Sequence, residues 1–192
     1  MIRIAVIGDI GSGKSYAAKQ FGYPVFNADI EVDKLYKKNR RCFVKIKKKL
    51  PGFISTFPIK KNELSRAIIA NQNNLKKIVK IIHPEVRFKM NSFVKKNKNK
   101  KFVVLDIPLI LENKINKKND ILVFVDANQK MISKKLKKRK NINMAIIKKF
   151  KKLQLPIEFK KKKANFIVKN NFLSTSLKKN VKRIIEKINS NA

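Results

Sequence analysis

One eight-residue segment, Gly8 to Ser15, constrains the fold of this chain more than any other. It reads G-D-I-G-S-G-K-S and satisfies the phosphate-loop pattern G-x-x-x-x-G-K-[ST]. An apolar run at 2–7 precedes the segment and is typical of a buried strand, and Tyr16–Gln20 continues it without a helix breaker. The pattern predicts a phosphate-binding loop between a strand and a helix. An ordinary glycine-rich turn is the alternative.

Each residue type would supply a distinct part of such a loop. Glycines let successive backbone N–H groups turn toward a phosphate chain, and the N-terminus of the following helix adds about half a positive charge. Lys14 would reach the terminal phosphates, and Ser15 would ligate magnesium. The residues expected to contact the nucleotide are Asp9, Ile10, Gly11, Ser12, Gly13, Lys14, Ser15 and Tyr16.

Length and composition indicate one globular domain. The chain has 192 residues, of which 43% are hydrophobic, and no apolar segment approaches the roughly 18 residues needed to cross a bilayer. Met1 leads directly into the first predicted strand, so we expect a cytoplasmic protein without a membrane partner. Cys42 is the only cysteine, which excludes an intramolecular disulfide and a cysteine metal cluster.

The formal net charge of +37 is the outlying property of the composition. Such a charge is compatible with a nucleic acid or an anionic membrane as a partner. However, lysine, asparagine and isoleucine are enriched together along the whole chain, and aromatic residues do not interleave with the lysines as a base-stacking surface requires. We therefore expect a lysine-rich solvent face and no specific nucleic-acid partner.

Further apolar runs predict four more strands and the helices between them. This alternation is typical of an α/β fold in which a parallel five-stranded sheet is flanked by helices. A C-terminal amphipathic helix carries apolar residues at helical spacing from Leu177 to Ile188. The four additional strands are expected at Tyr23–Phe26, Phe102–Leu105, Ile121–Val125 and Phe166–Val168.

Carboxylates follow several of these strands. Asp29 comes just after the second strand, at the edge where ligands bind in open α/β sheets. Asp106 closes the third strand as in a Walker B element, which predicts a magnesium ligand. Asp126 with Gln129 suggests instead a capping box for the next helix. Glu31 and Asp33 are expected either at the site or as favourable charges near a helix N-terminus.

The middle of the chain predicts helices. Asn62 is expected to cap a helix that Asn71–Asn74 divides in two, and His83-Pro84 to end the second piece. Pro84 would then begin another helix, Glu85 to Val94. His83, the only histidine, is expected either as a structural residue at this junction or as a ligand contact. Residues 134–163 are lysine-rich and predict either solvated amphipathic helices or a lid that carries Arg139 over the phosphates.

Several stretches, taken together and in order, resemble the dephospho-coenzyme A kinase family of P-loop kinases. The octapeptide L-D-I-P-L-I-L-E at Leu105–Glu112 and H-P-E-V-R at His83–Arg87 carry much of the resemblance. The other matching stretches are Gly8–Ser15, Ala28-Asp29, Glu63–Ile69, Gln154 and Ala164–Asn170.

The resemblance implies transfer of the ATP γ-phosphate to the 3′-hydroxyl of dephospho-coenzyme A, with ATP and Mg²⁺ as cofactors and a monomeric enzyme. It implies a P-loop kinase core at about 1–29, 99–129 and 164–192. A helical acceptor-binding insertion is expected at about 30–98, and a helical lid at about 130–163.

The resemblance also implies roles for single residues. Asp29 would be the catalytic base or orienter of the ribose hydroxyl, and Lys14 and Arg139 would stabilise phosphate charge. The acceptor side would include Asp29, His83, Pro108 and Glu112, and the metal ligands would be Ser15 and Asp106.

Two departures from the family pattern affect the site. Asp9 stands where glycine is common, and it would weaken nucleotide affinity unless its side chain points away from the phosphates. Asn27 stands where aspartate is frequent, which removes a possible second carboxylate near the metal. The alternative functions are another small-metabolite or nucleoside-monophosphate kinase, a basic nucleic-acid-binding protein that binds nucleotide, and a family member with reduced turnover.

Overall fold

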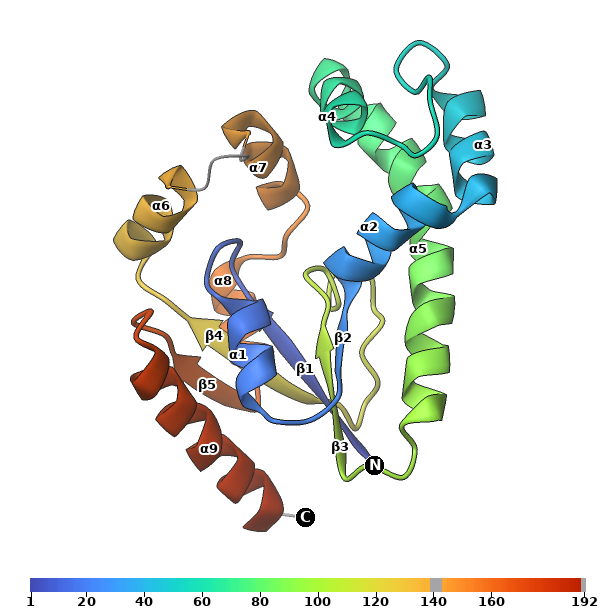
Figure 1. Cartoon of the computed structure of the whole chain (residues 1–192). Helices are drawn as coiled ribbons and strands as arrows, with labels where there is room; N and C mark the ends of the chain where they lie inside the picture. The colour runs from blue at the N-terminus through green and yellow to red at the C-terminus, as the bar shows by residue number, and fades with distance from the viewer. Residues whose placement is uncertain (139–142, 191–192) are drawn as a thin grey trace. The chain divides into compact units, whose positions relative to one another are not determined.

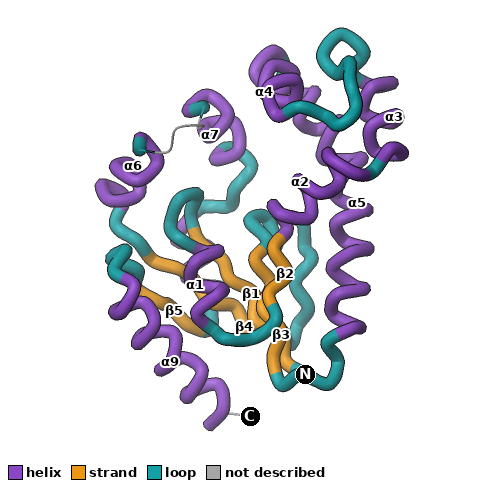
Figure 2. The backbone as a smooth tube through the Cα atoms, viewed as in Figure 1, coloured by secondary structure: helices purple, strands orange, loops and turns teal. Residues whose placement is uncertain are grey.

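Five apolar runs form the strands of one sheet in the computed structural model, which describes residues 1–138 and 143–190 (Figures 1 and 2). All neighbouring strands are parallel, and their order is β2-β3-β1-β4-β5. This confirms the predicted α/β fold with a parallel five-stranded sheet. The strands are β1 (Ile2–Gly8), β2 (Val25–Asn27), β3 (Phe102–Asp106), β4 (Ile121–Asp126) and β5 (Phe166–Lys169).

The chain divides into two compact units. The sheet unit comprises Met1–Asn27, Asn97–Ile142 and Lys151–Ala192, and the helical unit comprises Ala28–Lys96 and Asn143–Phe150. Two crossings of the chain therefore link the sheet unit to the first segment of the helical unit, at 27–28 and at 96–97.

The core of the sheet unit is built from the apolar runs of the strands. Ile4 and Val6 of β1 are fully buried, in one cluster with Ala17 and Ala18 of α1 (Lys14–Gln20) and Leu177 of α9 (Ser174–Ser190). This cluster exists because side chains two apart on a strand share a face, whereas those on a helix recur every three or four residues. Helix α8 (Ile157–Lys163) packs against β1 and β4, and α6 (Gln129–Lys137) follows β4.

The helical unit consists of α2 (Ala28–Lys38), α3 (Arg40–Lys49), α4 (Lys61–Ala70), α5 (Gln72–Lys96) and most of α7 (Met144–Lys151). Helices α2, α3 and α4 each pack against α5. The predicted break near Asn71–Asn74 is present, since α4 ends at Ala70 and α5 begins at Gln72.

The predicted helix end at His83-Pro84 is wrong. Helix α5 has 25 residues, Gln72–Lys96, and it continues through Pro84 without a break. Proline lacks an N–H and removes one hydrogen bond of the helix. The apolar residues on both sides of it, Ile78 and Ile82 before and Val86 and Met90 after, remain on one buried face. We infer that continuous packing along this face outweighs the lost hydrogen bond.

Two predicted helix caps are also displaced. Lys60 is the N-cap of α4, so Asn62 lies inside the first turn and accepts a hydrogen bond from Glu63 N at 2.8 Å. Asn128 is the N-cap of α6 and accepts hydrogen bonds from the N–H groups of residues 130 and 131, so Asp126 is not the cap. Both differences are of two residues or fewer, within the usual uncertainty of helix ends.

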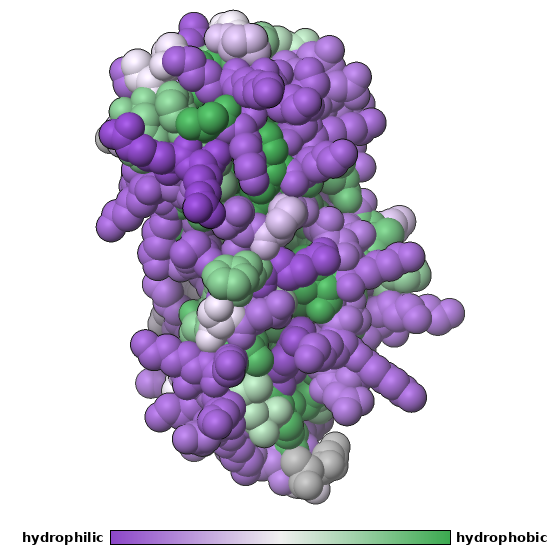
Figure 3. Space-filling model, turned by 90° about the vertical axis from the view of Figure 1, so that its right-hand side faces the viewer, coloured by the Kyte–Doolittle hydropathy of each residue, from purple (hydrophilic) through white to green (hydrophobic). Residues whose placement is uncertain are grey.

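One face of the molecule has the hydrophilic character that the composition predicts. Figure 3 shows one face, on which hydrophilic side chains predominate and apolar side chains form small separate groups. Within the parts of the chain that the structure describes, no helix is both long and apolar enough to cross a bilayer.

Candidate functional site

The loop from β1 to α1 has the backbone shape of a phosphate cradle. Gly11 and Gly13 have φ values of 83° and 90°, which side chains with a Cβ rarely adopt. The Lys14 Nζ lies inside the loop, donating to Asp9 O at 2.7 Å and Gly8 O at 3.4 Å, and Lys14 is only 8% exposed. The loop thus holds a buried ammonium at its centre, a position from which it could bind a phosphate chain.

Asn170, which follows β5, holds the loop from the side. Its Nδ2 donates to Ser12 O at 2.8 Å, and its Oδ1 accepts from Phe172 N at 2.9 Å. A Cβ on Gly13 would collide with the Asn170 amide, so glycine is needed there for space as well as for φ. The buried Ser12 Oγ has no hydrogen-bond partner among the described residues. Its hydroxyl could donate a hydrogen bond to a phosphate oxygen.

Three polar side chains meet beside the loop at the carboxyl ends of β2 and β3. Asn27 Nδ2 donates to Asp106 Oδ2 and lies 3.4 Å from Ser15 Oγ. Asp106 is 2% exposed, and burial raises the pKa of its carboxyl, although the hydrogen bond with Ser15, the nearby Lys14 charge and the Asn27 amide oppose this shift. The desolvated Asp106 carboxylate would therefore be stabilised by an additional cation.

This cluster fits a magnesium ion in part. Carboxylate and hydroxyl oxygens are ligands that Mg²⁺ prefers, and Mg²⁺ usually takes one or two protein carboxylates with the remaining positions filled by water and substrate phosphates. Among the described residues, no group of three or more histidine, cysteine, aspartate or glutamate side chains could hold a metal. With one carboxylate and one hydroxyl, Asp106 and Ser15 would leave the remaining positions around such an ion to water and phosphate oxygens.

Asp9 is buried in the structure and fully engaged. It is 6% exposed, its Oδ1 accepts from Ile10 N at 2.7 Å, and its Oδ2 accepts from Gln129 Nε2 at 3.0 Å. The Lys151 Nζ lies 3.7 Å from the same Oδ2. The negative charge in the loop is thus compensated by N–H donors and one ammonium group.

Two predicted site residues belong to the helical unit. Asp29 is exposed and lies in the first turn of α2, which begins at Ala28. His83 is half-buried within α5, between turns of a continuous helix rather than at a junction.

Glu112, predicted on the acceptor side, forms a buried ion pair. Its Oε1 lies 2.8 Å from Lys160 Nζ and accepts from Leu155 N at 3.0 Å, and the Lys160 side chain is 2% exposed. Pro108 is half-buried in the turn after β3. Lys160 therefore orients the one carboxylate of this turn.

The remaining predicted residues have separate places. Tyr16 is 45% exposed, and its Oη lies 2.5 Å from Ser174 Oγ at the start of α9. Arg139 lies outside the described residues.

The sequence pattern gave Asn170, Gln129 and Lys151 no part in the site, and it placed Gln129 only in a capping box with Asp126. Asn170 directly follows β5 and could have been found by the rule that applies to Asp29 and Asp106, because the carboxyl ends of parallel strands meet at one edge of the sheet. Gln129 and Lys151 carry no such signal, since their contacts with Asp9 span more than one hundred residues.

Comparisons with known proteins agree on one family. A family model described as dephospho-CoA kinase matches residues 2–178. The dephospho-CoA kinase of Wolbachia pipientis wMel is 33% identical, and the alignment covers 98% of each chain. A crystal structure of a Thermus thermophilus protein has a TM-score of 0.77 at 24% identity and covers 99% of this chain and 97% of its own. The dephospho-CoA kinase of Campylobacter jejuni has a TM-score of 0.63 at 20% identity, with 98% of each chain covered. The two structural likenesses concern the fold.

Proposed function

The chain belongs to the dephospho-CoA kinase family, and from this premise we propose how its residues carry out the reaction. The enzyme phosphorylates dephospho-coenzyme A with ATP in the final step of coenzyme A synthesis. The observation that supports the assignment below is the convergence of Lys14, Ser15, Asn27 and Asp106 at the carboxyl ends of three neighbouring strands.

The donor half of the site is the loop at 8–15. Its N–H groups and the Lys14 ammonium would bind the phosphates of ATP, and Lys14 would exchange its contacts with the loop carbonyls for phosphate oxygens. Because Lys14 is already buried in the loop, little side-chain entropy is lost when it binds the nucleotide. Electrostatic stabilisation of this kind is the main contribution of proteins to phosphoryl transfer.

Ser15 and Asp106 would hold Mg²⁺. The ion, when bound, would neutralise phosphate charge. Asn27 would keep the Asp106 carboxylate in place through its hydrogen bond, so that this carboxylate is oriented before nucleotide and metal bind.

The acceptor half would begin at Asp29. Consecutive Cα atoms are 3.8 Å apart, so the Cα of Asp29 lies at most about 7.6 Å from that of Asn27 in any conformation of the chain. Its carboxylate would accept the proton of the ribose 3′-hydroxyl as the hydroxyl oxygen bonds to the γ-phosphorus. The bond between that phosphorus and the β–γ bridging oxygen breaks, and ADP leaves.

The other acceptor contacts follow from the family resemblance. His83 and Pro108 would contact dephospho-coenzyme A, and Glu112 would do so with its carboxylate oriented by Lys160. Arg139 would bind phosphate oxygens during transfer, for which a planar guanidinium is better suited than an ammonium. The enzyme would act as a cytoplasmic monomer, with neither a membrane nor a specific nucleic acid as a partner.

The direct test is a coupled assay of ADP release with ATP, Mg²⁺ and dephospho-coenzyme A, with the product identified by mass spectrometry. We expect turnover that requires both Mg²⁺ and dephospho-coenzyme A, from a protein that light scattering shows to be a monomer. Turnover of nucleoside monophosphates without turnover of dephospho-coenzyme A would overturn the substrate. Tight nucleic-acid binding that survives Lys14→Ala and falls steeply with salt would support a nucleic-acid partner.

A further inference from the structure

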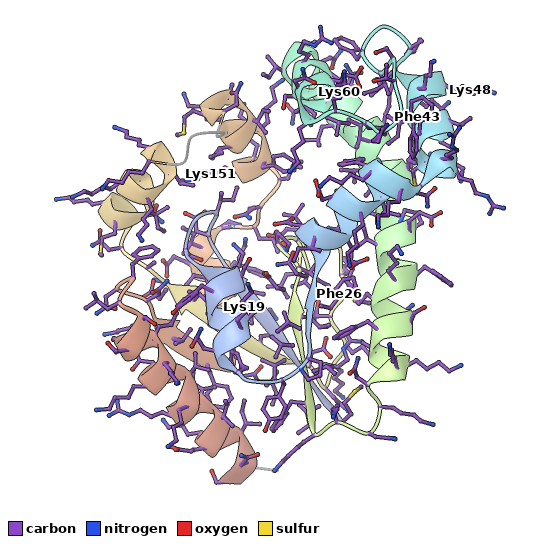
Figure 4. All side chains as sticks on the ribbon, viewed as in Figure 1. Lys19, Phe26, Phe43, Lys48, Lys60 and Lys151 are labelled. Atoms are coloured by element: carbon purple, nitrogen blue, oxygen red, sulfur yellow. The ribbon has the colours of Figure 1, made fainter. Side chains whose placement is uncertain are left out.

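A single carboxylate oxygen in the phosphate loop contacts both ends of the segment 129–151. Asp9 Oδ2 accepts a hydrogen bond from Gln129 Nε2 at 3.0 Å and lies 3.7 Å from Lys151 Nζ. Gln129 is the first residue of α6, and Lys151 is the last residue of α7. Figure 4 labels Lys151 beside the loop between β1 and α1.

Hydrogen bonds to both carboxylate oxygens fix the orientation of the Asp9 side chain. A carboxylate only accepts hydrogen bonds, so the nitrogen of the Gln129 amide must be the atom that faces it. The second oxygen, Oδ1, accepts from Ile10 N at 2.7 Å. With one oxygen held by the loop backbone and the other by α6, the Asp9 side chain has a single orientation.

Lys151 has a different environment. Its side chain is 44% exposed, whereas that of Asp9 is 8% exposed. An exposed lysine normally samples many rotamers, and ordering one in a salt bridge costs side-chain entropy. A buried carboxylate at 3.7 Å restrains this ammonium near the loop, while its remaining N–H donors can still reach solvent or a ligand.

The position of this pair suggests a role in nucleotide binding. The backbone of Asp9 is part of the cradle, since its carbonyl oxygen accepts from Lys14 Nζ at 2.7 Å. A carboxylate there would repel the phosphates of ATP unless a cation compensates it. Lys151 is the cation that the structure places against this carboxylate.

We propose that Asp9 is a positioning residue that holds the Lys151 ammonium at the phosphate loop, where Lys151 acts as a second cation, beside Lys14, for the phosphates of ATP. Without Lys151, the Asp9 carboxylate would repel the phosphates and oppose nucleotide binding. By holding the Lys151 ammonium at the loop, Asp9 favours nucleotide binding instead. This proposal rests on the proposed function for one premise, that ATP is the phosphate donor.

The test is a double-mutant cycle in which calorimetry measures the affinity of the full chain for a non-hydrolysable ATP analogue with Mg²⁺. We expect Asp9→Asn and Lys151→Met each to weaken binding about tenfold, the typical effect of losing one hydrogen bond to a charged group. The double variant should bind no more weakly than either single variant, because each change removes the same interaction. Lys152→Met, a change at the exposed neighbouring lysine, is the matched control and should have no effect on affinity.

Three outcomes would overturn the proposal. Tighter binding by Asp9→Asn would show that Asp9 only repels the nucleotide. Single effects that multiply in the double variant would show two independent roles. Unchanged affinity in the Lys151→Met variant would show that Lys151 does not bind phosphates.

Steady-state kinetics separates positioning from a structural role. We expect both single variants to raise KM for ATP about tenfold and to leave KM for dephospho-coenzyme A unchanged, with Lys151→Arg restoring KM for ATP. Binding of the ATP analogue requires no acceptor, so the cycle remains informative if dephospho-coenzyme A proves not to be the substrate. A failure to turn over dephospho-coenzyme A would reject the proposed acceptor. The affinities for the ATP analogue, measured by calorimetry, would still decide whether Asp9 positions Lys151.

Discussion

The side-chain amide of Asn27 donates a hydrogen bond to the carboxylate of Asp106 across the carboxyl ends of two parallel strands. The two residues are register partners in β2 and β3, so the sheet itself fixes their approach. Asp106 is 2% exposed, and burial raises its pKa. A buried carboxylate with neutral neighbours and one lysine nearby is costly in the absence of a cation, and two predictions follow from this cost.

The first prediction is that Asp106→Asn stabilises the enzyme in the absence of metal and nucleotide but impairs catalysis. Since the carboxyl pKa is higher in the folded state than in the unfolded state, the folded protein binds more protons between the two values. The free energy of unfolding therefore falls as pH rises from 3.8 through the raised pKa, and stays reduced at neutral pH. We expect a higher melting temperature for the variant than for the wild type at pH 7, and no such difference near pH 3.8. Activity should fall about tenfold or more.

A melting temperature at pH 7 below that of the wild type would contradict this account of Asp106. Magnesium titrations of activity give the second readout, since loss of a metal ligand raises the Mg²⁺ concentration that half-saturates the enzyme.

The second prediction concerns Asn27→Asp. This change would place two carboxylates in contact, and like charges at such a distance raise the pKa of one of them and destabilise the folded state at neutral pH. We expect a lower melting temperature without Mg²⁺ and recovery when Mg²⁺ and nucleotide are added, because a cation would neutralise the pair. Melting curves with and without Mg²⁺ check it, and a variant that gains no stability from Mg²⁺ would argue against a metal site here.

The third prediction assigns the base. Asp29→Asn should bind ATP with unchanged affinity and lower kcat by about 10²- to 10⁴-fold, the usual contribution of general base catalysis. Asp33→Asn is the matched control, because Asp33 lies in the same helix and pairs with Lys37 at 2.6 Å and Lys61 at 3.2 Å. The control should retain kcat. Equal loss in both variants would indicate a general effect on α2, and normal turnover of Asp29→Asn would reject the base.

The fourth prediction concerns the buried pair of Lys160 and Glu112. Lys160→Met would leave the Glu112 carboxylate buried without its cation, and we expect the free energy of unfolding to fall by about 3–5 kcal/mol. Lys161→Met is the neighbouring control, since Lys161 is 31% exposed and lies 3.4 Å from a half-exposed Asp126. That change should cost about 1 kcal/mol or less. Urea denaturation measures both, and the double variant Lys160→Met with Glu112→Gln should regain most of the loss.

The sequence predicted the sheet well because each strand is a short apolar run followed by a glycine or a polar residue. All five runs, from the one before Gly8 to the one at Phe166–Val168, are strands within two residues of their expected bounds. The strand order was beyond this reasoning, because pairing depends on contacts between runs far apart in the chain. The motif residues Lys14, Ser15 and Asp106 do lie together. The phosphate-loop motif and the position of Asp106 at the end of a strand had predicted a shared magnesium site for Ser15 and Asp106.

Local rules failed where tertiary packing decided the outcome. Pro84 was expected to begin a helix, but a continuous apolar face carries α5 through it. Lys160 lies in a run of four lysines, which predicts solvent exposure. Its side chain is nevertheless buried, where its ammonium pairs with the Glu112 carboxylate. Asp9 was expected to weaken nucleotide affinity unless its side chain points away from the phosphates, and its partners Gln129 and Lys151 could not be identified from spacing.

The fifth prediction tests what the charge of +37 does. Both substrates are anions, so a strongly positive enzyme attracts them over a distance that salt sets, from about 30 Å at 0.01 M to about 8 Å at 0.15 M ionic strength. We expect kcat/KM for ATP to fall about tenfold or more over this range while kcat changes little, since steering accelerates encounter and not the chemical step. Sucrose in place of salt controls for a general solvent effect.

Single-stranded DNA should inhibit the enzyme only at low salt, because scattered lysines without interleaved aromatic residues give screened, non-specific contacts. Inhibition that persists at 0.15 M would instead indicate a nucleic-acid site on the lysine-rich surface.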